Sequence, residues 1–143
     1  MNIRPATKND LPVIYEFICG LEEQRFDFDR FAACFEQCFH NRANHYLIAE
    51  ANGKPVGFLS CHGQMLLHHC GLVYEIQELY VDEAYRSHGV GKQLLAALYE
   101  IIDPVQYELL EVSSNMRRKD AHRFYLNNGY EQTSYKFKKI SKQ

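Results

Sequence analysis

A short loop with two glycines is where residue types and spacing first point to chemistry. It reads Arg86-Ser87-His88-Gly89-Val90-Gly91 and is followed by Lys92. Because glycine lacks a Cβ atom, a ligand can closely approach the backbone of Gly89 and Gly91. A helix beginning here would direct free N–H groups and its positive dipole end at an anion, while Arg86 and Lys92 add charge. The loop predicts a phosphate site, although glycines at this spacing also serve as simple turn residues.

The two best-known phosphate motifs do not occur in this sequence. There is no Gly-x-x-x-x-Gly-Lys-Ser/Thr run for a nucleoside triphosphate and no Gly-x-Gly-x-x-Gly run for a dinucleotide. The loop therefore predicts a different diphosphate ligand.

Two carboxylates, Glu75 and Glu78, lie in the apolar run that precedes the loop. A carboxylate beside a ligand site can act as a general base that accepts a proton, directly or through one water. Regular strand alternation would place the two side chains on opposite faces, and a bulge would change this facing. Each could instead be an ordinary surface or salt-bridged residue.

The elements that must position these residues follow from periodicity. Period-two patterns predict strands at residues 3–5, 45–51, 55–65, 72–81, 107–112 and 131–140. Helical spacing predicts a helix after Thr7 or Asn9 that ends near Gly20, one capped by Asp29, and two more at residues 90–102 and 120–127. Asn52-Gly53 predicts a tight hairpin. The order indicates one α+β domain over residues 1–143, with a single mixed sheet and helices on its faces.

Composition narrows the partners. The 16 Lys and Arg residues against 18 Asp and Glu residues give a net charge of -2, which favours neither nucleic acid nor an anionic membrane. No apolar run approaches the roughly 18 residues of a membrane span, so the sequence predicts a cytoplasmic protein.

The 5 cysteines contain no Cys-x-x-Cys pair and are expected to be reduced thiols. Cys34, Cys38 and His40 could ligate a metal, but the two cysteines also fit a buried helix face. Cys61-His62 lies on an expected strand, where neighbours point to opposite faces, so we do not expect a catalytic Cys-His pair.

The loop resembles the Gln/Arg-x-x-Gly-x-Gly/Ala signature of GNAT acetyltransferases, here Arg86-x-x-Gly89-x-Gly91. Asn115 and Phe124-Tyr125-x-x-x-Gly129-Tyr130 match the same superfamily, and the element order agrees over essentially the whole chain. The resemblance implies a mostly antiparallel twisted sheet that splays between the strands at residues 72–81 and 107–113. It also implies acetyl-coenzyme A as co-substrate.

The resemblance further implies roles for named residues. Glu75 or Glu78 would be the general base, with Glu75 preferred, and Tyr125 would protonate the leaving thiolate, unless Tyr125 is simply an aromatic packing against Phe124. The expected cofactor-binding residues are Leu79, Tyr80, Val81, Arg86, Ser87, His88, Gly89, Val90, Gly91, Lys92, Asn115 and Phe124.

A closer resemblance is to the aminoalkylphosphonate N-acetyltransferases of bacterial phosphonate metabolism. It rests on His68-His69 and on residues 75–79, 120–126 and 129–132. It implies that the acceptor is the amine of a small aminoalkylphosphonate, and it leaves a divalent metal ion and a homodimer open. A phosphonate needs cationic or metal partners. The candidates are His68, His69, Arg25 and Arg123, with Arg117 and Arg118 also available.

Two other functions stay open. A polyamine or aminoglycoside acceptor is a cation and would favour carboxylates such as Glu22, Glu23, Asp27 and Asp29. A non-catalytic sensor of acetyl-coenzyme A is the other alternative. Retention of Glu75, Glu78 and Tyr125 argues against a sensor.

Overall fold

The computed structural model describes residues 1–141 of the chain. They fall into two compact units, Met1–Val112 and Ser113–Gln143, here called the first and the second unit. The first unit holds the sheet and three α-helices, and the second holds one α-helix. None of the described helices is long and apolar enough to cross a membrane.

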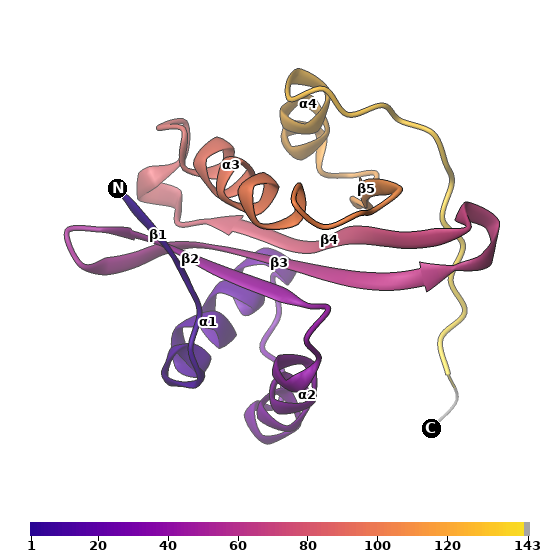
Figure 1. Ribbon diagram of the computed structural model, residues 1–143. Helices are drawn as coiled ribbons and strands as arrows, with labels where there is room; N and C mark the ends of the chain where they lie inside the picture. Colours follow the sequence, from indigo (N-terminus) through magenta and orange to yellow (C-terminus); the bar gives the residue numbers. More distant parts are fainter. Residues whose placement is uncertain (142–143) are drawn as a thin grey trace. The chain divides into compact units, whose positions relative to one another are not determined.

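A single five-stranded sheet forms the centre of the first unit (Figure 1). Its strands follow the order β1-β2-β3-β4-β5, and every neighbouring pair is antiparallel except β4 and β5, which are parallel. The strands are β1 (Asn2–Pro5), β2 (His45–Ala51), β3 (Lys54–Leu66), β4 (Gly71–Val81) and β5 (Leu109–Val112).

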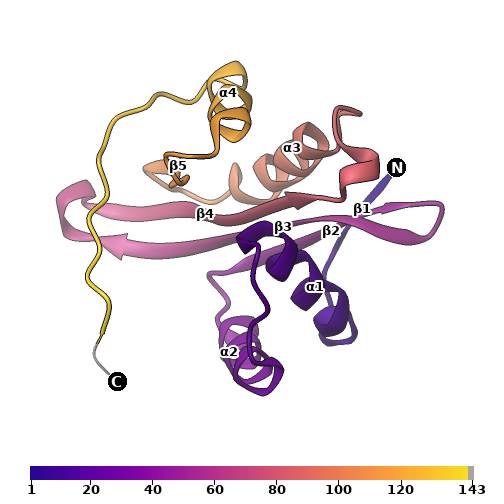
Figure 2. The ribbon, with the colours of Figure 1, turned by 180° about the vertical axis from the view of Figure 1, so that it is seen from behind.

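Helices cover both faces of this sheet. The α-helices are α1 (Leu11–Glu22), α2 (Phe28–His40), α3 (Val90–Ile102) and, in the second unit, α4 (Lys119–Asn127). Short 3-10 turns lie at η1 (Lys8–Asp10), η2 (Leu67–His69) and η3 (Glu83–Tyr85). Helices α1 and α2 lie on one face and α3 on the other, as the front and back views show (Figures 1 and 2). The mixed sheet with helices on both faces confirms the expected fold class.

The hydrophobic core reflects this layering. On one face, a buried cluster joins helices α1 and α2 to strands β2 and β3. Its members are Ile14, Phe17, Phe35, Ile48 and Phe58. The adjacent Gly57 faces the other way, because a Cβ built on it would lie 3.2 Å from a methyl carbon of Val90 in α3. Burying each large apolar side chain contributes about 1.5–3 kcal/mol, so the two faces together stabilise the sheet.

Local signals predicted five of the six expected strands and the hairpin well, and the helix limits less well. Asn52 and Gly53 have φ values of 54° and 75°, which confirms the tight hairpin. The cap of α2 is Asp27, whose carboxylate accepts the Arg30 N–H at 2.9 Å, rather than Asp29. Helix α1 runs past Gly20 to Glu22.

The helix end expected at Gly20 and the burial expected for Cys34 are both absent, for separate reasons. Gly20 serves close packing, since a Cβ there would lie 2.8 Å from the Tyr80 hydroxyl oxygen. Cys34 is exposed, because α2 turns a narrower apolar stripe toward the sheet than the spacing predicted.

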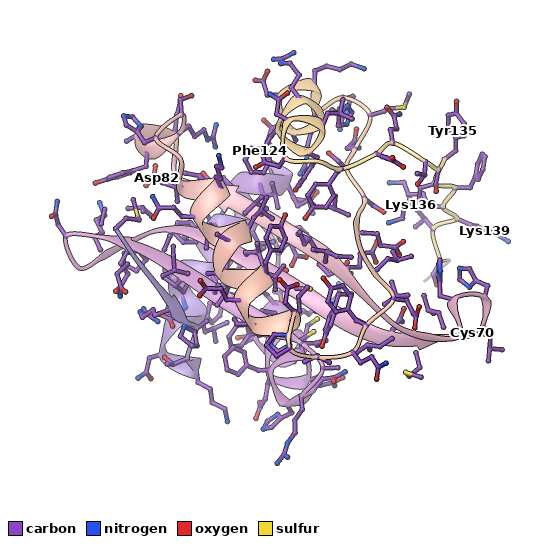
Figure 3. The ribbon with its side chains drawn as sticks, turned by 45° about the horizontal axis from the view of Figure 1, so that its top comes forward. Cys70, Asp82, Phe124, Tyr135, Lys136 and Lys139 are labelled. Atoms are coloured by element: carbon purple, nitrogen blue, oxygen red, sulfur yellow. The ribbon has the colours of Figure 1, made fainter. Side chains whose placement is uncertain are left out.

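The strand expected at residues 131–140 is wrong. These residues form neither helix nor strand, and Tyr135 and Phe137 are 89% and 91% exposed. In Figure 3 the side chains of Tyr135, Lys136 and Lys139 project from an irregular chain. The alternation is present, but a strand also needs a partner for its backbone hydrogen bonds, and the described part of the second unit contains no other strand.

An ion-pair network ties the chain start to the sheet. Arg4 on β1 donates two hydrogen bonds of 2.8 Å to the nearly buried carboxylate of Asp10. Its Nε lies 3.0 Å from the carboxylate of Glu50 on β2. The Arg4 guanidinium and the Thr7 N–H hold the pKa of Asp10 below its usual value.

Asp10→Asn is expected to lower the free energy of unfolding at pH 7 by about 2 kcal/mol, since it breaks a largely buried pair. Because the folded pKa of Asp10 is lowered, its contribution is complete above the unfolded value of about 3.9 and disappears as pH falls through the folded value. Urea unfolding at pH 7 and pH 3 measures the difference.

The matched control is Glu100→Gln, which changes an exposed carboxylate of α3. We expect it to alter stability by less than about 0.5 kcal/mol at both pH values. A loss for Asp10→Asn that stayed constant from pH 7 to pH 3 would contradict the assigned ion pair.

Candidate active site

The geometry of β4 is set by a β-bulge at Gln77. Along β3 and β4, Ser60 pairs with Glu78 and Cys61 pairs with Ile76, which leaves Gln77 as the extra residue. On the N-terminal side of the bulge in β4, Glu75 pairs with His62. Ser60 and His62 are two residues apart and share a face, so their partners Glu78 and Glu75 share it too. Regular alternation would have placed them on opposite faces; the bulge, the alternative left open from the sequence, places them on one face.

The bulge also lies where β4 separates from β5. The parallel pairing runs from Val73 with Leu109 to Ile76 with Val112 and stops there. In the described chain, residues 77–81 of β4 therefore have a strand partner only in β3. This is the splay expected between residues 72–81 and 107–113.

A cavity of about 270 Å³ lies beside this point. Glu75 and Gln77 line it from β4, and the Gln77 side-chain amide donates a 3.0 Å hydrogen bond to the Glu75 carboxylate. The remaining lining residues are His62, Gln64, Val73 and Glu111. With two carboxylates, one imidazole and two amides, the cavity suits a small cation that can donate several hydrogen bonds.

His62 is held in this cavity by Tyr46 of β2. The Tyr46 hydroxyl and His62 Nε2 are 2.9 Å apart, and the two rings meet edge to face. Burial lowers the pKa of His62, while the nearby Glu75 carboxylate opposes this shift. Cys61, its neighbour, is fully buried and pairs with Ile76, which supports the view that Cys61 and His62 do not act together.

Glu78 has a different environment from Glu75. It hydrogen-bonds to the hydroxyl of Ser60, which is fully buried, and its own N–H donates to that hydroxyl at 3.0 Å. Burial raises the pKa of Glu78, and the Ser60 hydrogen bond only partly offsets this. Glu78 thus lies among packed residues, whereas Glu75 lines the cavity.

The glycine loop begins just beyond β4. Figure 3 labels Cys70 and Asp82, which flank β4 at its two ends. Ser87 and Gly89 have φ values of 65° and 80°, and Gly89 caps α3 with no side-chain hydrogen bond. A Cβ on Gly89 would meet no atom within 4 Å, so its surroundings are open. The first amides of α3 are thus available to an anion, as the loop pattern predicted.

Arg86 is fixed at the base of the loop. Its Nε donates a 2.8 Å hydrogen bond to the Val81 carbonyl, and its guanidinium lies 5.4 Å from the centre of the Tyr80 ring. The Tyr80 ring in turn packs against Phe17 of α1, with ring centres 5.4 Å apart. Of the three β4 residues expected to bind cofactor, Tyr80 therefore turns its side chain toward α1, and its backbone is what remains for a ligand.

The other loop residues are placed as follows. The His88 Nδ1 is 2.7 Å from the Arg86 carbonyl, and Lys92 lies exposed in the first turn of α3. Leu79 pairs with Leu59 on the face opposite to Glu78.

The cations expected to hold an anionic acceptor do not line the cavity. Arg25 makes two hydrogen bonds, 2.7 and 3.0 Å long, to the Glu16 carboxylate. His68 and His69 lie in η2 rather than on a strand, and their rings are 4.2 Å apart because the turn brings them together. Their predicted roles stay predictions.

The second unit contains the remaining expected residues. Phe124 and Tyr125 are adjacent on α4, and Tyr125 also contacts the Tyr130 ring at 5.6 Å between centres. The Asn115 side-chain oxygen accepts the Arg117 N–H at 3.0 Å, and Arg123 pairs with Asp120.

No three His, Cys, Asp or Glu side chains within residues 1–141 gather closely enough to hold a metal ion. The divalent ion that the resemblance left open thus finds no ligand set in the described chain.

Several residues of the site were missed from the sequence. Ser60, Gln64 and Glu111 carry no motif, and Tyr46 resembles any strand aromatic. Alternation along residues 60–64 would have indicated that Ser60, His62 and Gln64 share a face. Their alignment with Glu75 depends on the bulge.

Comparison with known proteins gives the chain's family. Residues 11–130 match the family described as "Acetyltransferase (GNAT) family". The aminoalkylphosphonate N-acetyltransferase of Salmonella typhimurium is 40% identical over 137 residues, covering 96% of this chain and 89% of that protein. An uncharacterized N-acetyltransferase of Bacillus subtilis, YhfO, is 27% identical and covers 92% of this chain and 91% of its own length.

Solved structures share the fold at low identity. A protein described as a transcriptional regulator from Bacillus halodurans C-125 has a TM-score of 0.87 and 22% identity, covering 98% of this chain and 99% of its own. An aminoglycoside N-acetyltransferase, AAC(6')-Iy, solved in complex with CoA, has a TM-score of 0.86 and 19% identity, covering 99% and 95%. The family match over most of the chain, a relative at 40% identity and the splayed sheet together place this enzyme in the GNAT acetyltransferase family.

Proposed function

We propose that this enzyme transfers the acetyl group of acetyl-coenzyme A to the primary amine of a small aminoalkylphosphonate, by direct attack in a ternary complex. The observation that carries the proposal is the 40% identity, over nearly the whole chain, to a protein of that activity. The polar cavity beside the splay supports an amine acceptor.

The first unit offers a site for the co-substrate. Coenzyme A brings a diphosphate, and the open backbone at Gly89 with the first amides of α3 suits that group. Arg86, already fixed by Val81 and Tyr80, adds positive charge without further loss of side-chain freedom. The backbone of residues 79–81 is proposed to hold pantetheine, with Asn115 and Phe124 as further contacts.

The cavity residues are proposed to receive the amine. Its ammonium form is attracted to Glu75 and Glu111, and the amides of Gln64 and Gln77 line the same space. Since Arg and Lys are absent from the lining, the phosphonate would extend toward cations outside it, for which Arg25, Arg123, His68 and His69 are the candidates.

An acceptor with several amines is the second candidate. The two carboxylates in the cavity favour it, because a polyamine or aminoglycoside carries positive charge and needs no cationic pocket. The two acceptor classes differ in one testable respect, namely whether an anionic group on the substrate improves turnover.

A panel of amines tests the proposal. Thiol release from acetyl-coenzyme A is measured with short aminoalkylphosphonates, with alkylamines of equal length that lack the phosphonate, with a polyamine and with an aminoglycoside. We expect kcat/KM for the phosphonates to exceed that of the matched alkylamines by about 10- to 100-fold, the value of one or two charged hydrogen bonds. A preference for the polyamine or aminoglycoside would favour the second candidate. Thermal stabilisation by coenzyme A without thiol release from any amine would indicate a sensor.

Gly89→Val tests the anion loop. A β-branched residue is strongly disfavoured at a φ of 80°, so the loop must leave its present conformation. We expect KM for acetyl-coenzyme A to rise at least about 10-fold.

Gly53→Val is the matched control for this loop. Gly53 has a similar φ of 75° and equally open surroundings, but it lies in the β2–β3 hairpin. Both variants should lose similar stability, and only Gly89→Val should lose affinity for acetyl-coenzyme A. Equal KM values in the two variants would contradict the loop assignment.

Tyr125→Phe tests the proposed acid. Loss of the phenol proton donor should lower kcat about 100-fold, with little change in KM for acetyl-coenzyme A. The control is Tyr135→Phe, which changes a tyrosine of the same unit that is 89% exposed. An unchanged kcat in Tyr125→Phe would remove Tyr125 from the mechanism.

A further inference from the structure

The proton of the acceptor ammonium must go to a base before or during attack, and the cavity offers a base besides the two carboxylates. We propose that His62 accepts this proton at Nδ1, while Tyr46 fixes the ring and Glu75 stabilises the protonated imidazole. The inference rests on the proposed amine acetylation, but it does not depend on which amine is the acceptor.

The register of the sheet places His62 beside the proposed ammonium site. His62 on β3 pairs directly with Glu75 on β4, and both line the cavity with Glu111 from β5. Directly opposed residues of an antiparallel pair have Cβ atoms about 5 Å apart, which leaves room for one ammonium group in contact with both side chains.

Tyr46 leaves one nitrogen of the ring for the substrate. Its hydroxyl lies 2.9 Å from His62 Nε2 and also receives the Asn44 side-chain amide at 3.3 Å. The Tyr46 ring itself stacks against Phe39 and Phe58, with centres 5.3 and 6.3 Å away. The hydroxyl is therefore fixed in place, and among the described residues Nδ1 of His62 has no hydrogen-bond partner.

Burial favours a neutral imidazole at rest, and the Glu75 carboxylate stabilises the cation that forms on proton transfer. Burial lowers the pKa of His62, and Glu75 opposes the shift. Burial also raises the pKa of Tyr46, so the phenol keeps its proton, and the Cys38 thiol of α2 is near enough to raise that pKa further. Tyr46 can then donate to the Cys38 sulfur and accept the Nε2–H of His62, which leaves the Nδ1 lone pair free.

The proton balance is simple. One N–H bond of the ammonium breaks and an Nδ1–H bond forms, giving a neutral amine beside an imidazolium that faces Glu75. The amine nitrogen then forms a bond to the acetyl carbon and the C–S bond breaks; the nitrogen loses its second proton and the departing thiolate gains one, so the products are the amide and the free thiol. His62 returns its proton to water before the next turnover. An imidazole is ordinarily a stronger base than a carboxylate, with a pKa of about 6.5 against about 4.3, and Glu75 opposes the lowering of the His62 pKa by burial.

The test uses His62→Gln with whichever amine the full-length enzyme acetylates best. Glutamine places a donor near Nε2 but offers no base. We expect kcat at pH 7 to fall about 100-fold with KM for acetyl-coenzyme A unchanged. In the wild-type enzyme, kcat plotted against pH should fall on the acidic side as His62 becomes protonated. In His62→Gln this acidic limb should be absent, and kcat should instead rise with pH toward the amine's own pKa near 10.

Two further variants distinguish the proposed role of His62 as base from the proposed role of Glu75 as the group that stabilises the imidazolium. Glu75→Gln and Tyr46→Phe should both keep an acidic limb and move it to lower pH, because each removes a group that stabilises the imidazolium. His45→Gln is the matched control: His45 is another partly buried strand histidine, it packs against Tyr74, and its profile should not change. His62→Asn, checked for folding by thermal unfolding, should behave as His62→Gln does.

Three results would overturn the proposal. One is an acidic limb that persists in His62→Gln, and another is a limb that disappears in Glu75→Gln. The third is nitrogen NMR of labelled histidine that finds the resting proton of His62 on Nδ1. Each can occur in an enzyme that acetylates amines, so each leaves the proposed function intact. Absence of turnover with every amine would instead contradict the proposed function.

Discussion

The bulge at Gln77 is the constraint on which the site depends. One extra residue in β4 turns Glu78 onto the face that carries Glu75, Ser60 and His62. The same residue follows directly after the last pair between β4 and β5, so the strand changes direction where the sheet begins to splay. Without the bulge, Glu75 and Glu78 would lie on opposite faces of the sheet.

The two glutamates show how one strand gives two chemical environments. Glu78 is surrounded by packed side chains and shares its hydrogen bonds with a fully buried serine, so its negative charge is costly. Glu75 lies three residues away beside Gln77, His62 and an open space of about 270 Å³. Of the two glutamates, Glu75 is the one that lines the cavity. This placement favours Glu75 over Glu78 as the residue that meets a substrate amine.

Local sequence signals predicted the parts of the fold that depend on neighbouring residues. The Asn52-Gly53 hairpin, the strand before the loop and the helix after it all follow from turn chemistry and periodicity. Residues 131–140 show the limit, because alternation alone does not supply a strand partner. The bulge could not be located for the same reason: it is a property of the pairing between β3 and β4, and no residue type marks it.

Strand β4 connects the glycine loop at residues 86–91 to the cavity. Arg86 is tied to the Val81 carbonyl and to the Tyr80 ring, and Tyr80 packs against Phe17 of α1. Gly20 lets α1 approach this ring, since a Cβ there would meet the Tyr80 hydroxyl at 2.8 Å. A ligand that pulls on Arg86 therefore acts on the same strand that carries Gln77 and Glu75. The anion loop and the cavity thus share one strand, and the packing of Tyr80 against α1 supports that strand beside both.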